Sequence, residues 1–322
     1  MHEESSRSIV NRRDFLQTSG QLGVGLAAGL MAPHSLPSIA TAAEPPAGPA
    51  KCLSLSLAAY SFHRSLPRNW PTPRDGNPTM TLEDFIDYCA ELKLDGTELT
   101  SYYFRRDITP EYLDSLKDRV KSHGMAISGT AIANDFCLPE GDQRQETLAT
   151  TRMWIDHAAR IGAPCIRIFA GNAPKGASET QAIARCARGI NESVAYAATK
   201  GVILALENHG GITSDPDTML RIVEQVSPSP FFGINFDSGN LQLEDPYAAL
   251  EKIAPLAVNA QIKTEMHPHG RKGPAEPADL ERIVGILREA GYCRYLVLEY
   301  EAAEDPRKAI PRYIDQLREL TS

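Results

Sequence analysis

The stretch VILALENHGG, Val202 to Gly211, joins an apolar run to a polar end. A continuous apolar run of this length is typical of a strand that is buried on both faces, as in a parallel sheet. The run closes on Glu207, Asn208 and His209. A buried carboxylate costs free energy unless it is paired or bound to a cation. The stretch therefore predicts a buried strand whose end carries a functional site.

Seven further runs of this kind alternate with amphipathic segments along the chain. Helical patterns occupy 81–93, 110–124 and 304–320, and Thr81 followed by Asp84 resembles a capping box at the start of the first. The eight predicted strands span 52–60, 94–100, 125–132, 164–171, 201–207, 231–237, 257–264 and 294–300.

Eight strands that each precede a helix predict a single (β/α)8 barrel over residues 51–322. The alternative is a doubly wound open sheet, which usually carries a glycine-rich turn after its first strand. The corresponding segment here, SLAAYSFHRSL at 56–66, contains no glycine. The barrel is therefore the favoured architecture, and it brings the carboxyl ends of all eight strands to one face.

The N-terminus resembles an export signal. NRRDFLQ (11–17) carries paired arginines, and a glycine- and alanine-rich stretch at 22–32 and ATA at 40–42 follow. This pattern predicts a twin-arginine signal over residues 1–42, a proline-rich linker over 43–50, and a periplasmic protein. The apolar stretch is too short and too rich in glycine for a stable membrane anchor. A disordered basic N-terminus and an uncleaved anchor are the alternatives.

The net charge and the cysteines of the chain bear on two further questions, whether it binds nucleic acid and whether it contains disulfide bonds. The chain of 322 residues has a formal net charge of −8, which argues against a nucleic-acid partner. Its six cysteines include no CxxC pair, and several lie in apolar runs. We expect mostly free, buried thiols, with an isolated disulfide as the alternative.

Acidic side chains recur at the predicted strand ends. Side chains alternate along a strand, so Glu207, Asp237 and Glu299 should point into the barrel mouth. Three carboxylates in one mouth repel one another unless a cation lies among them. A divalent metal is the simplest cation, and a salt-bridge network with bases such as Arg167 and Lys263 is the alternative.

These strand ends resemble the xylose isomerase-like TIM-barrel superfamily, in its sugar phosphate isomerase/epimerase branch that includes the ketose 3-epimerases. The resemblance covers essentially the whole chain after the signal. It implies that Glu207, Asp237 and Glu299 bind one divalent metal. The remaining ligand position, the third in chain order, falls on Gln261, where the family often has a histidine two residues before a lysine. Asn240 stands where a further family histidine follows the aspartate.

Loss of these two histidines leaves an oxygen-only ligand set of Glu207, Asp237, Gln261 and Glu299. Such a set favours Mn²⁺ or Mg²⁺, with Zn²⁺ and Co²⁺ as alternatives. By the resemblance, Glu207 and Glu299 also transfer the proton. Lys263 is expected to steady the enediolate or hold a hydroxyl group, and a surface or ion-pair lysine is the alternative. Other strand ends build the predicted sugar pocket, which comprises Tyr60, Phe62, Glu98, Asn134, Arg167, His209 and Asn240.

The resemblance implies a metal-dependent sugar isomerase or epimerase that removes a proton next to a carbonyl. A lyase that cleaves 3-keto-glycosides by β-elimination uses the same first step and is the second hypothesis. A non-catalytic carbohydrate-binding barrel is the third, although binding alone needs no opposed pair of carboxylates. The expected partner is a small sugar or glycoside, and barrels of this family often form homodimers.

Overall fold

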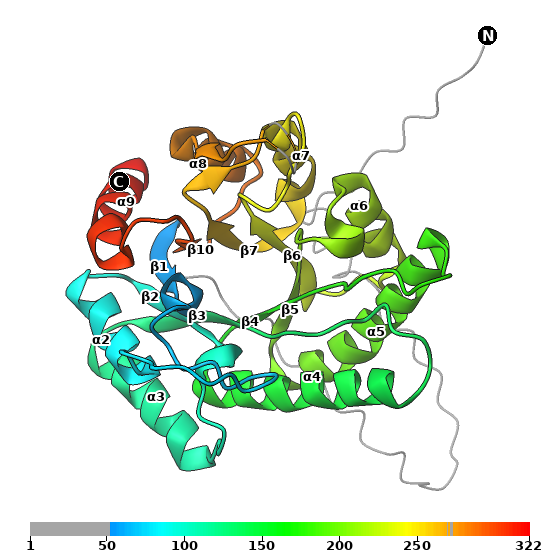
Figure 1. Cartoon of the computed structure of the whole chain (residues 1–322), viewed down its shortest axis with the longest axis horizontal. Coiled ribbons are helices and arrows are strands. Elements are labelled where there is room, and N and C mark those ends of the chain that lie inside the picture. Colours follow the sequence, from blue (N-terminus) through cyan, green and yellow to red (C-terminus); the bar gives the residue numbers. More distant parts are fainter. Residues whose placement is uncertain (1–51, 269, 271–272) are drawn as a thin grey trace, which may run out of the picture. The chain divides into compact units, whose positions relative to one another are not determined.

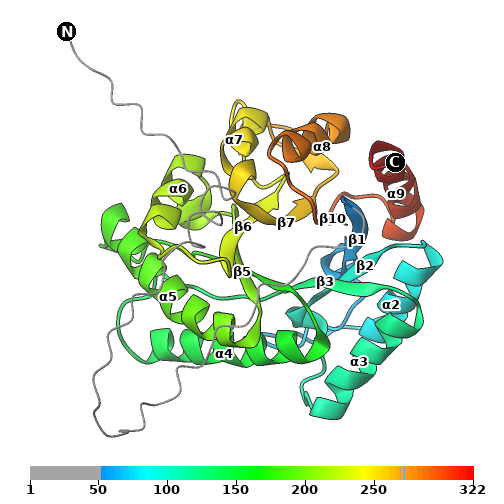
Figure 2. The ribbon, with the colours of Figure 1, turned by 180° about the vertical axis from the view of Figure 1, so that it is seen from behind.

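A computed structural model describes residues 52–268, 270 and 273–322. Eight parallel strands close into a barrel in the order β1-β10-β7-β6-β5-β4-β3-β2, and helices surround it (Figures 1 and 2). All eight predicted strands are present, so the predicted (β/α)8 barrel is confirmed. The barrel strands are β1 (Ser54–Ala58), β2 (Gly96–Thr100), β3 (Ala126–Ala131), β4 (Cys165–Ile168), β5 (Ile203–Glu207), β6 (Phe232–Asp237), β7 (Ala257–Ile262) and β10 (Tyr295–Leu298).

Local sequence signals set the helix boundaries. The predicted capping box is present, because Thr81 Oγ1 accepts from Asp84 N at 3.1 Å and Asp84 Oδ2 accepts from Thr81 N at 2.9 Å. Glycine in the left-handed region follows α4 and α5, at Gly162 (φ 80°) and Gly201 (φ 71°). The α-helices are α2 (Leu82–Glu91), α3 (Pro110–Ser122), α4 (Asp142–Ile161), α5 (Glu179–Lys200), α6 (Pro216–Gln225), α7 (Pro246–Ile253), α8 (Leu280–Glu289) and α9 (Pro306–Leu320). Short 3-10 turns are η1 (Ala59–Phe62), η2 (Ser101–Tyr103), η3 (Gly211–Thr213) and η4 (Ala254–Leu256).

The interior of the barrel is polar. Asn259 Nδ2 on β7 donates to Glu98 Oε2 on β2 at 3.2 Å, and these strands are not neighbours in the barrel. Ser56 Oγ and Ser128 Oγ likewise lie 2.7 Å apart in a hydrogen bond between β1 and β3. Barrels of this kind are usually filled by branched apolar side chains. Here a hydrogen-bonded column runs inward from the strand ends instead.

Strand register places the predicted site residues side by side. Glu207 on β5 is level with Asn235 on β6, and Asp237 on β6 is level with Gln261 on β7. Asn208 fixes the β5–β6 edge, because its amide accepts from Asp237 N at 2.8 Å and donates to Asp237 O at 2.7 Å. The strand register therefore fixes where the site side chains of β5, β6 and β7 lie relative to one another.

One element was not predicted. After β7 the chain forms a two-stranded antiparallel hairpin of β8 (Glu265–Met266) and β9 (Glu276–Pro277). Strands of two residues are too short to show an alternating pattern in the sequence.

The cysteines follow the expectation in four of six cases. Cys89, Cys137, Cys165 and Cys186 are free and buried. The remaining two, Cys52 and Cys293, form a disulfide bond. The bond ties the chain just before β1 to the chain just before β10, two strands that pair in the barrel.

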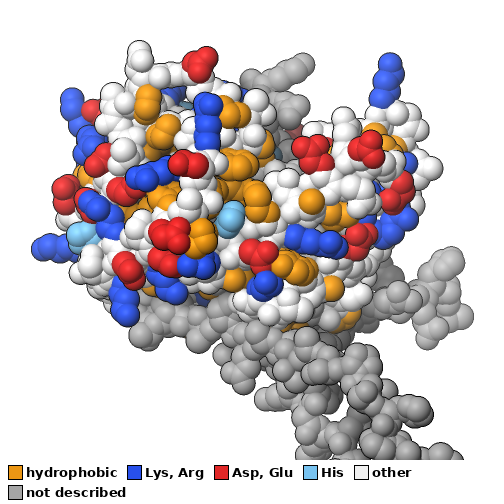
Figure 3. Space-filling view, turned by 90° about the horizontal axis from the view of Figure 1, so that it is seen from below, with side chains coloured by type: hydrophobic (Ala, Val, Ile, Leu, Met, Phe, Trp, Pro, Cys, Tyr) orange, Lys and Arg blue, Asp and Glu red, His pale blue; other side chains and the backbone are white. Residues whose placement is uncertain are grey.

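The predicted export signal and linker (1–50) lie outside the described residues. Within the described part of the chain, no helix is long and apolar enough to span a membrane. The face seen from below carries acidic and basic side chains interspersed with apolar ones (Figure 3).

Candidate active site

A cavity of about 220 Å³ opens at the carboxyl ends of the strands. Its position agrees with the general rule that active sites of such barrels lie on this face. Seven predicted site residues line it, and they come from both halves of the chain. The cavity is lined by Tyr60, Arg68, Tyr102, Arg167, Phe169, Glu207, His209, Asn240, Lys263, Glu299 and Glu301.

Glu207 is held by basic and amide groups on three sides. Its side chain is only 4% exposed, and Arg167 Nε forms an ion pair with Oε2 at 2.7 Å, without the direction of a hydrogen bond. Asn240 Nδ2 donates to Oε1 at 2.9 Å and Asn235 Nδ2 to Oε2 at 3.3 Å. Burial raises the pKa of Glu207 well above its ordinary value, against the opposing effect of Arg167. The raised pKa favours the protonated form of the carboxyl group, which is the form that can return a proton.

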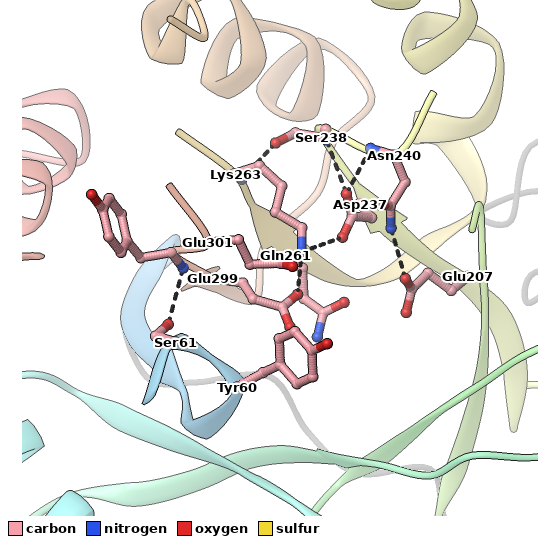
Figure 4. Close-up of polar contacts among 12 residues, drawn as sticks. Tyr60, Ser61, Glu207, Asp237, Ser238, Asn240, Gln261, Lys263, Glu299 and Glu301 are labelled. Carbon is pink, nitrogen blue, oxygen red and sulfur yellow. Dashed lines mark hydrogen bonds and ion pairs between the residues drawn. The ribbon is translucent and has the colours of Figure 1, made fainter. Parts of the chain in front are cut away.

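Lys263 lies among the other carboxylates of the mouth (Figure 4). Its Nζ is 2.9 Å from Glu299 Oε2 and 3.4 Å from Asp237 Oδ2, and it also pairs with Glu301. Burial opposes its charge, but these carboxylates raise the pKa of Lys263 well above its ordinary value. The lysine is therefore a fixed positive charge in the mouth.

Asp237 has one satisfied and one free carboxylate oxygen. Oδ1 accepts from the backbone N–H groups of Gly239 at 2.9 Å and Asn240 at 3.0 Å. Oδ2 is buried and accepts no hydrogen bond, with only the ion pair to Lys263 near it. Burial raises the pKa of Asp237 to about 7. Gly239 permits this turn, because a Cβ there would lie 2.6 Å from Lys263 Cβ.

Gln261 and Glu98 lie below the cavity in the polar column. Gln261 Nε2 donates to Glu98 Oε1 at 2.8 Å, and Gln261 Oε1 accepts from Asn235 Nδ2 at 2.7 Å. Both ends of the Gln261 amide are therefore engaged. Burial, followed by the charge of Glu299, raises the pKa of Glu98 to about 7. Glu98 was predicted at the sugar pocket, whereas its contacts place it beneath that pocket.

Two other predicted pocket residues lie away from the cavity. Phe62 is 2% exposed and packs edge-on against Phe85 and Tyr88, so its ring belongs to the core beneath α2. Asn134 bridges two strand ends: its amide donates to Phe169 O at 2.7 Å and accepts from Phe169 N at 2.9 Å. Side-chain alternation alone does not distinguish such backbone-bonded or core positions from a pocket lining.

His209 lines the cavity beside Phe169, with the two ring centres 4.3 Å apart. Burial, together with the positive charges of Arg167 and Lys263, lowers the pKa of His209 to about 4. The imidazole is therefore neutral at pH 7, and it can both donate and accept hydrogen bonds.

Sequence reasoning missed Arg68 and Asn259. Arg68 lies in the irregular connection between η1 and α2, where no periodic pattern marks its direction, and its guanidinium lies 3.8 Å from the centre of the Tyr102 ring. Asn259 did carry a signal, since it alternates with Gln261 and Lys263 along β7. A polar residue on the inward face two positions below Gln261 could have revealed the polar column.

The donor atoms at the strand ends suit a hard divalent cation. Glu207, Asp237 and Glu299 supply carboxylate oxygens and Gln261 an amide oxygen with a second lone pair, which are ligands that Mg²⁺ and Mn²⁺ prefer. The buried Oδ2 of Asp237 accepts no hydrogen bond, and its one partner is the Lys263 ammonium 3.4 Å away. Burial is the main cause of the raised pKa of three carboxyls, Glu98, Glu207 and Asp237, and the charge of neighbouring carboxylates adds to it.

The side chains are nevertheless arranged around basic groups. Lys263 pairs with Asp237 and Glu299, and Arg167 pairs with Glu207. Among the residues that the structure describes, no three His, Cys, Asp or Glu side chains are placed to hold a metal ion together. A cation bound by these carboxylates therefore has to displace the Lys263 ammonium from Asp237 or Glu299.

The buried Glu98 carboxyl predicts a pH-dependent stability. Its pKa of about 7 in the folded chain exceeds the ordinary value of 4.5, so the folded state binds a proton that the unfolded state releases. Its contribution to the free energy of unfolding therefore falls as pH rises from about 4.5 to 7, by about 3 kcal/mol at most. We expect Glu98→Gln to flatten this fall, measured by urea unfolding in chelator at pH 5, 6, 7 and 8.

The exposed Glu91 offers a matched control for this measurement. Glu91→Gln removes an equal charge and should leave the pH profile as in the wild type. Identical profiles for wild type and Glu98→Gln would show that Glu98 is ionised at neutral pH in the folded chain.

Comparison with known proteins identifies the family of this barrel. A family model described as xylose isomerase-like TIM barrel matches residues 86–320. No curated protein matches the chain significantly. D-psicose 3-epimerase from Clostridium cellulolyticum H10, solved with D-tagatose, superposes with a TM-score of 0.65 at 12% identity, covering 84% of this chain and 98% of that one.

Two further structures superpose with slightly lower scores. The 3-keto-D-glucoside 4-epimerase from E. coli gives a TM-score of 0.62 at 15% identity and covers 83% of this chain and 99% of that one. A xylose isomerase-like TIM barrel protein from Mycobacterium smegmatis in complex with magnesium gives 0.62 at 16% identity, covering 84% and 98%. Such identities support the fold alone. The family match spans more than half of the sequence, and the chain therefore belongs to the xylose isomerase-like TIM-barrel family.

Proposed function

We propose that this protein is a sugar isomerase or epimerase that removes a proton from a carbon next to a carbonyl. The observation that carries the proposal is the placement of Glu207 and Glu299 around one small cavity, together with the cationic Arg167 and Lys263. In the barrel order, β6 and β7 lie between β5, which ends in Glu207, and β10, which precedes Glu299. The two carboxylates therefore approach a bound sugar from different sides.

The proposed reaction needs one base and one acid. Glu299 removes the proton, the C–H electron pair forms a C=C bond, and the carbonyl electron pair moves to oxygen to give an enediolate. Glu207, whose pKa burial raises, returns a proton from the other side. Return to the same carbon, as the carbonyl re-forms from the enediolate oxygen, gives the epimer. Return to the former carbonyl carbon gives the isomer; here the hydroxyl on the carbon that lost its hydrogen becomes the new carbonyl, and its proton moves to the enediolate oxygen. Each step conserves protons and electrons within the sugar and these two carboxyls.

Neighbouring side chains would hold the sugar and its developing charge. Lys263 and Arg167 are positioned to stabilise negative charge on the substrate oxygens. Tyr60 and Phe169 line the cavity and supply aromatic surface for a sugar, which is apolar on one face. His209, being neutral, can accept from or donate to a hydroxyl group.

We propose a divalent cation, preferably Mn²⁺ or Mg²⁺, at Glu207, Asp237 and Glu299, with the Gln261 amide oxygen as a fourth ligand. When bound, such a cation supplies positive charge to the sugar oxygens at the moment the proton leaves. The free Oδ2 of Asp237 supports this placement.

The predicted twin-arginine signal leads us to propose a periplasmic enzyme, which would meet free sugars and glycosides more than sugar phosphates. A second cavity that shares Tyr60 and Arg68 with the first gives room for more than a monosaccharide. This room favours an oxidised glycoside as an alternative substrate. Removal of the same proton would then lead to β-elimination of the glycosidic group.

Deuterium exchange tests the proposal for any of these substrates. The chelator-treated protein is reloaded with Mn²⁺ or Mg²⁺ and incubated in D₂O with aldoses, ketoses and 3-keto-glucosides, and NMR follows the hydrogen next to the carbonyl. We expect metal-dependent exchange accompanied by an epimer, an isomer or an elimination product.

Chelator-treated protein without added metal provides the control, and metal content per chain is measured on the same samples. A sugar that binds in calorimetry but never exchanges hydrogen would identify a carbohydrate-binding barrel. Hydrogen exchange at the same rate with and without metal would support the proposed enzymatic reaction but contradict the proposed role of the cation.

A further inference from the structure

A second cavity, of about 430 Å³, lies beside the catalytic cavity. It forms between the irregular segment that follows η1 and the loop after η2, and it is within the size range of small-molecule sites. The two cavities share Tyr60 and Arg68. A ligand bound in one can therefore reach into the other. We call the second cavity the arginine cavity, because Arg64, Arg68, Arg74 and Arg106 all line it.

The arginine cavity concentrates positive charge in an acidic protein. Four arginines and a single acidic residue, Asp75, line it, whereas the chain as a whole has a net charge of −8. Within the described residues, none of the four forms an ion pair. Many arginines on the outer helices do, as in Arg119 with Asp87 and Arg160 with Asp114. The charge of the cavity is therefore left uncompensated by the protein.

Arg68 provides a second and independent indication of a ligand. Its guanidinium lies 3.8 Å from the centre of the Tyr102 ring, which fixes it between the two cavities. Its Nε is buried and has no hydrogen-bond partner. A buried donor without an acceptor costs free energy. The guanidinium lines both cavities, so its outer N–H groups can donate to an anionic ligand there.

The backbone around the cavity is held in place. Arg74 N donates to Arg68 O at 2.9 Å, so the segment folds back on itself and brings these arginines to one side. Asn69 Nδ2 donates to Phe104 O at 2.9 Å and Trp70 Nε1 to Arg105 O at 3.0 Å, which ties the segment to the loop that carries Arg106. The arginine cavity is thus formed by two segments that are bonded to each other.

We propose that the arginine cavity binds an oxyanion carried by the substrate, so that the enzyme acts on an acidic sugar or glycoside. The inference rests on the proposed function, since the reacting carbonyl would lie in the catalytic cavity. A guanidinium presents paired N–H donors that match the oxygens of a carboxylate, a sulfate or a phosphate ester. All three groups are anionic, and the group would lie in the arginine cavity while the proton is removed in the neighbouring catalytic cavity.

Calorimetry on the metal-loaded protein tests this inference. The ligands are D-glucuronate, D-glucose 6-sulfate and D-glucose 6-phosphate, with neutral D-glucose and inorganic phosphate for comparison. We expect at least one of the acidic sugars to bind at least tenfold more tightly than D-glucose, with a preference that weakens as salt is added. The strongest of the three then distinguishes carboxylate, sulfate and phosphate as the group recognised.

Arginine-to-glutamine variants locate the effect. The triple variant R64Q/R74Q/R106Q should lose at least tenfold of the preference for the acidic sugar. The control variant R152Q/R188Q/R221Q removes the same charge from exposed positions on α4, α5 and α6 and should keep the preference. Circular dichroism verifies that each variant is folded.

The results separate this inference from the proposed function. Equal binding of acidic and neutral sugars by the wild type, or an unchanged preference in R64Q/R74Q/R106Q, would overturn the oxyanion site. In that case hydrogen exchange with neutral sugars would still support the proposed function. Selective binding of acidic sugars without hydrogen exchange in any of them would support the oxyanion site and contradict the proposed function.

Discussion

Glu299→Gln is expected to lower the rate of epimerisation about a thousandfold, because a positioned proton-transfer group contributes roughly 10²–10⁴ in rate. The substitution keeps the size of the side chain and leaves an amide oxygen that Lys263 can still contact. We therefore expect the KM for the sugar to change less than kcat. Steady-state kinetics on the substrate identified by deuterium exchange measures both quantities.

The opposed carboxylate should fail in a different way. If Glu299 removes the proton and Glu207 returns one from the other side, Glu207→Gln still allows Glu299 to exchange hydrogen in the original configuration. We expect this variant to incorporate deuterium into the substrate while producing little epimer, which NMR resolves directly. The two variants together thus distinguish the two carboxyls by role.

Glu301→Gln is the comparison for both variants, since Glu301 also contacts Lys263 but is 41% exposed at the rim. Its effect on kcat should stay within about tenfold, as for a charge that only neighbours the reacting groups. Equal losses in all three variants would mean that removing any carboxylate near Lys263 disrupts the site. The two-base assignment would then be wrong.

Much of this fold could be predicted from local sequence patterns. The eight apolar runs, the capping box at Thr81 and the glycines after helices each report a preference of a few neighbouring residues. The strand-end acids could also be predicted, because parallel strands in a barrel bring their carboxyl ends together. Barrel closure and the meeting of Glu207, Lys263 and Glu299 at one cavity follow from these patterns without further information.

The contacts inside the mouth could not be predicted in the same way. Alternation places Gln261 on the inward face, but it does not show that Asn235 and Glu98 engage both ends of its amide. Those partners lie 26 and 163 residues away in sequence. The position of Arg68 could not be predicted for a related reason, because an irregular segment has no sequence period from which the direction of a side chain can be inferred. Which acid pairs with which base, and which amide donates to which oxygen, depends on distances that only the folded chain defines.

Lys263→Met is expected to tighten Mn²⁺ binding at least tenfold while lowering kcat. The Lys263 ammonium lies within ion-pair distance of Asp237, Glu299 and Glu301, so a cation at these carboxylates must displace it or tolerate its charge. Two unit charges 4 Å apart interact by about 4 kcal/mol at an effective dielectric constant of 20, which exceeds the 1.4 kcal/mol of a tenfold change. Titration of the chelator-treated protein with Mn²⁺, followed by electron paramagnetic resonance, gives the dissociation constant.

Tighter Mn²⁺ binding together with a lower kcat in Lys263→Met would show that Lys263 competes with the cation and also contributes to the reaction of the sugar. Lys252→Met removes a lysine that pairs with Asp217 on the outer helices, and it should change neither quantity. Loss of Lys263 also leaves Asp237 and Glu299 without their counter-charge, so the variant should unfold at a lower temperature than the wild type and recover more stability on adding Mn²⁺. Unchanged or weaker Mn²⁺ binding in Lys263→Met would mean that the cation does not bind at the carboxylates that Lys263 holds.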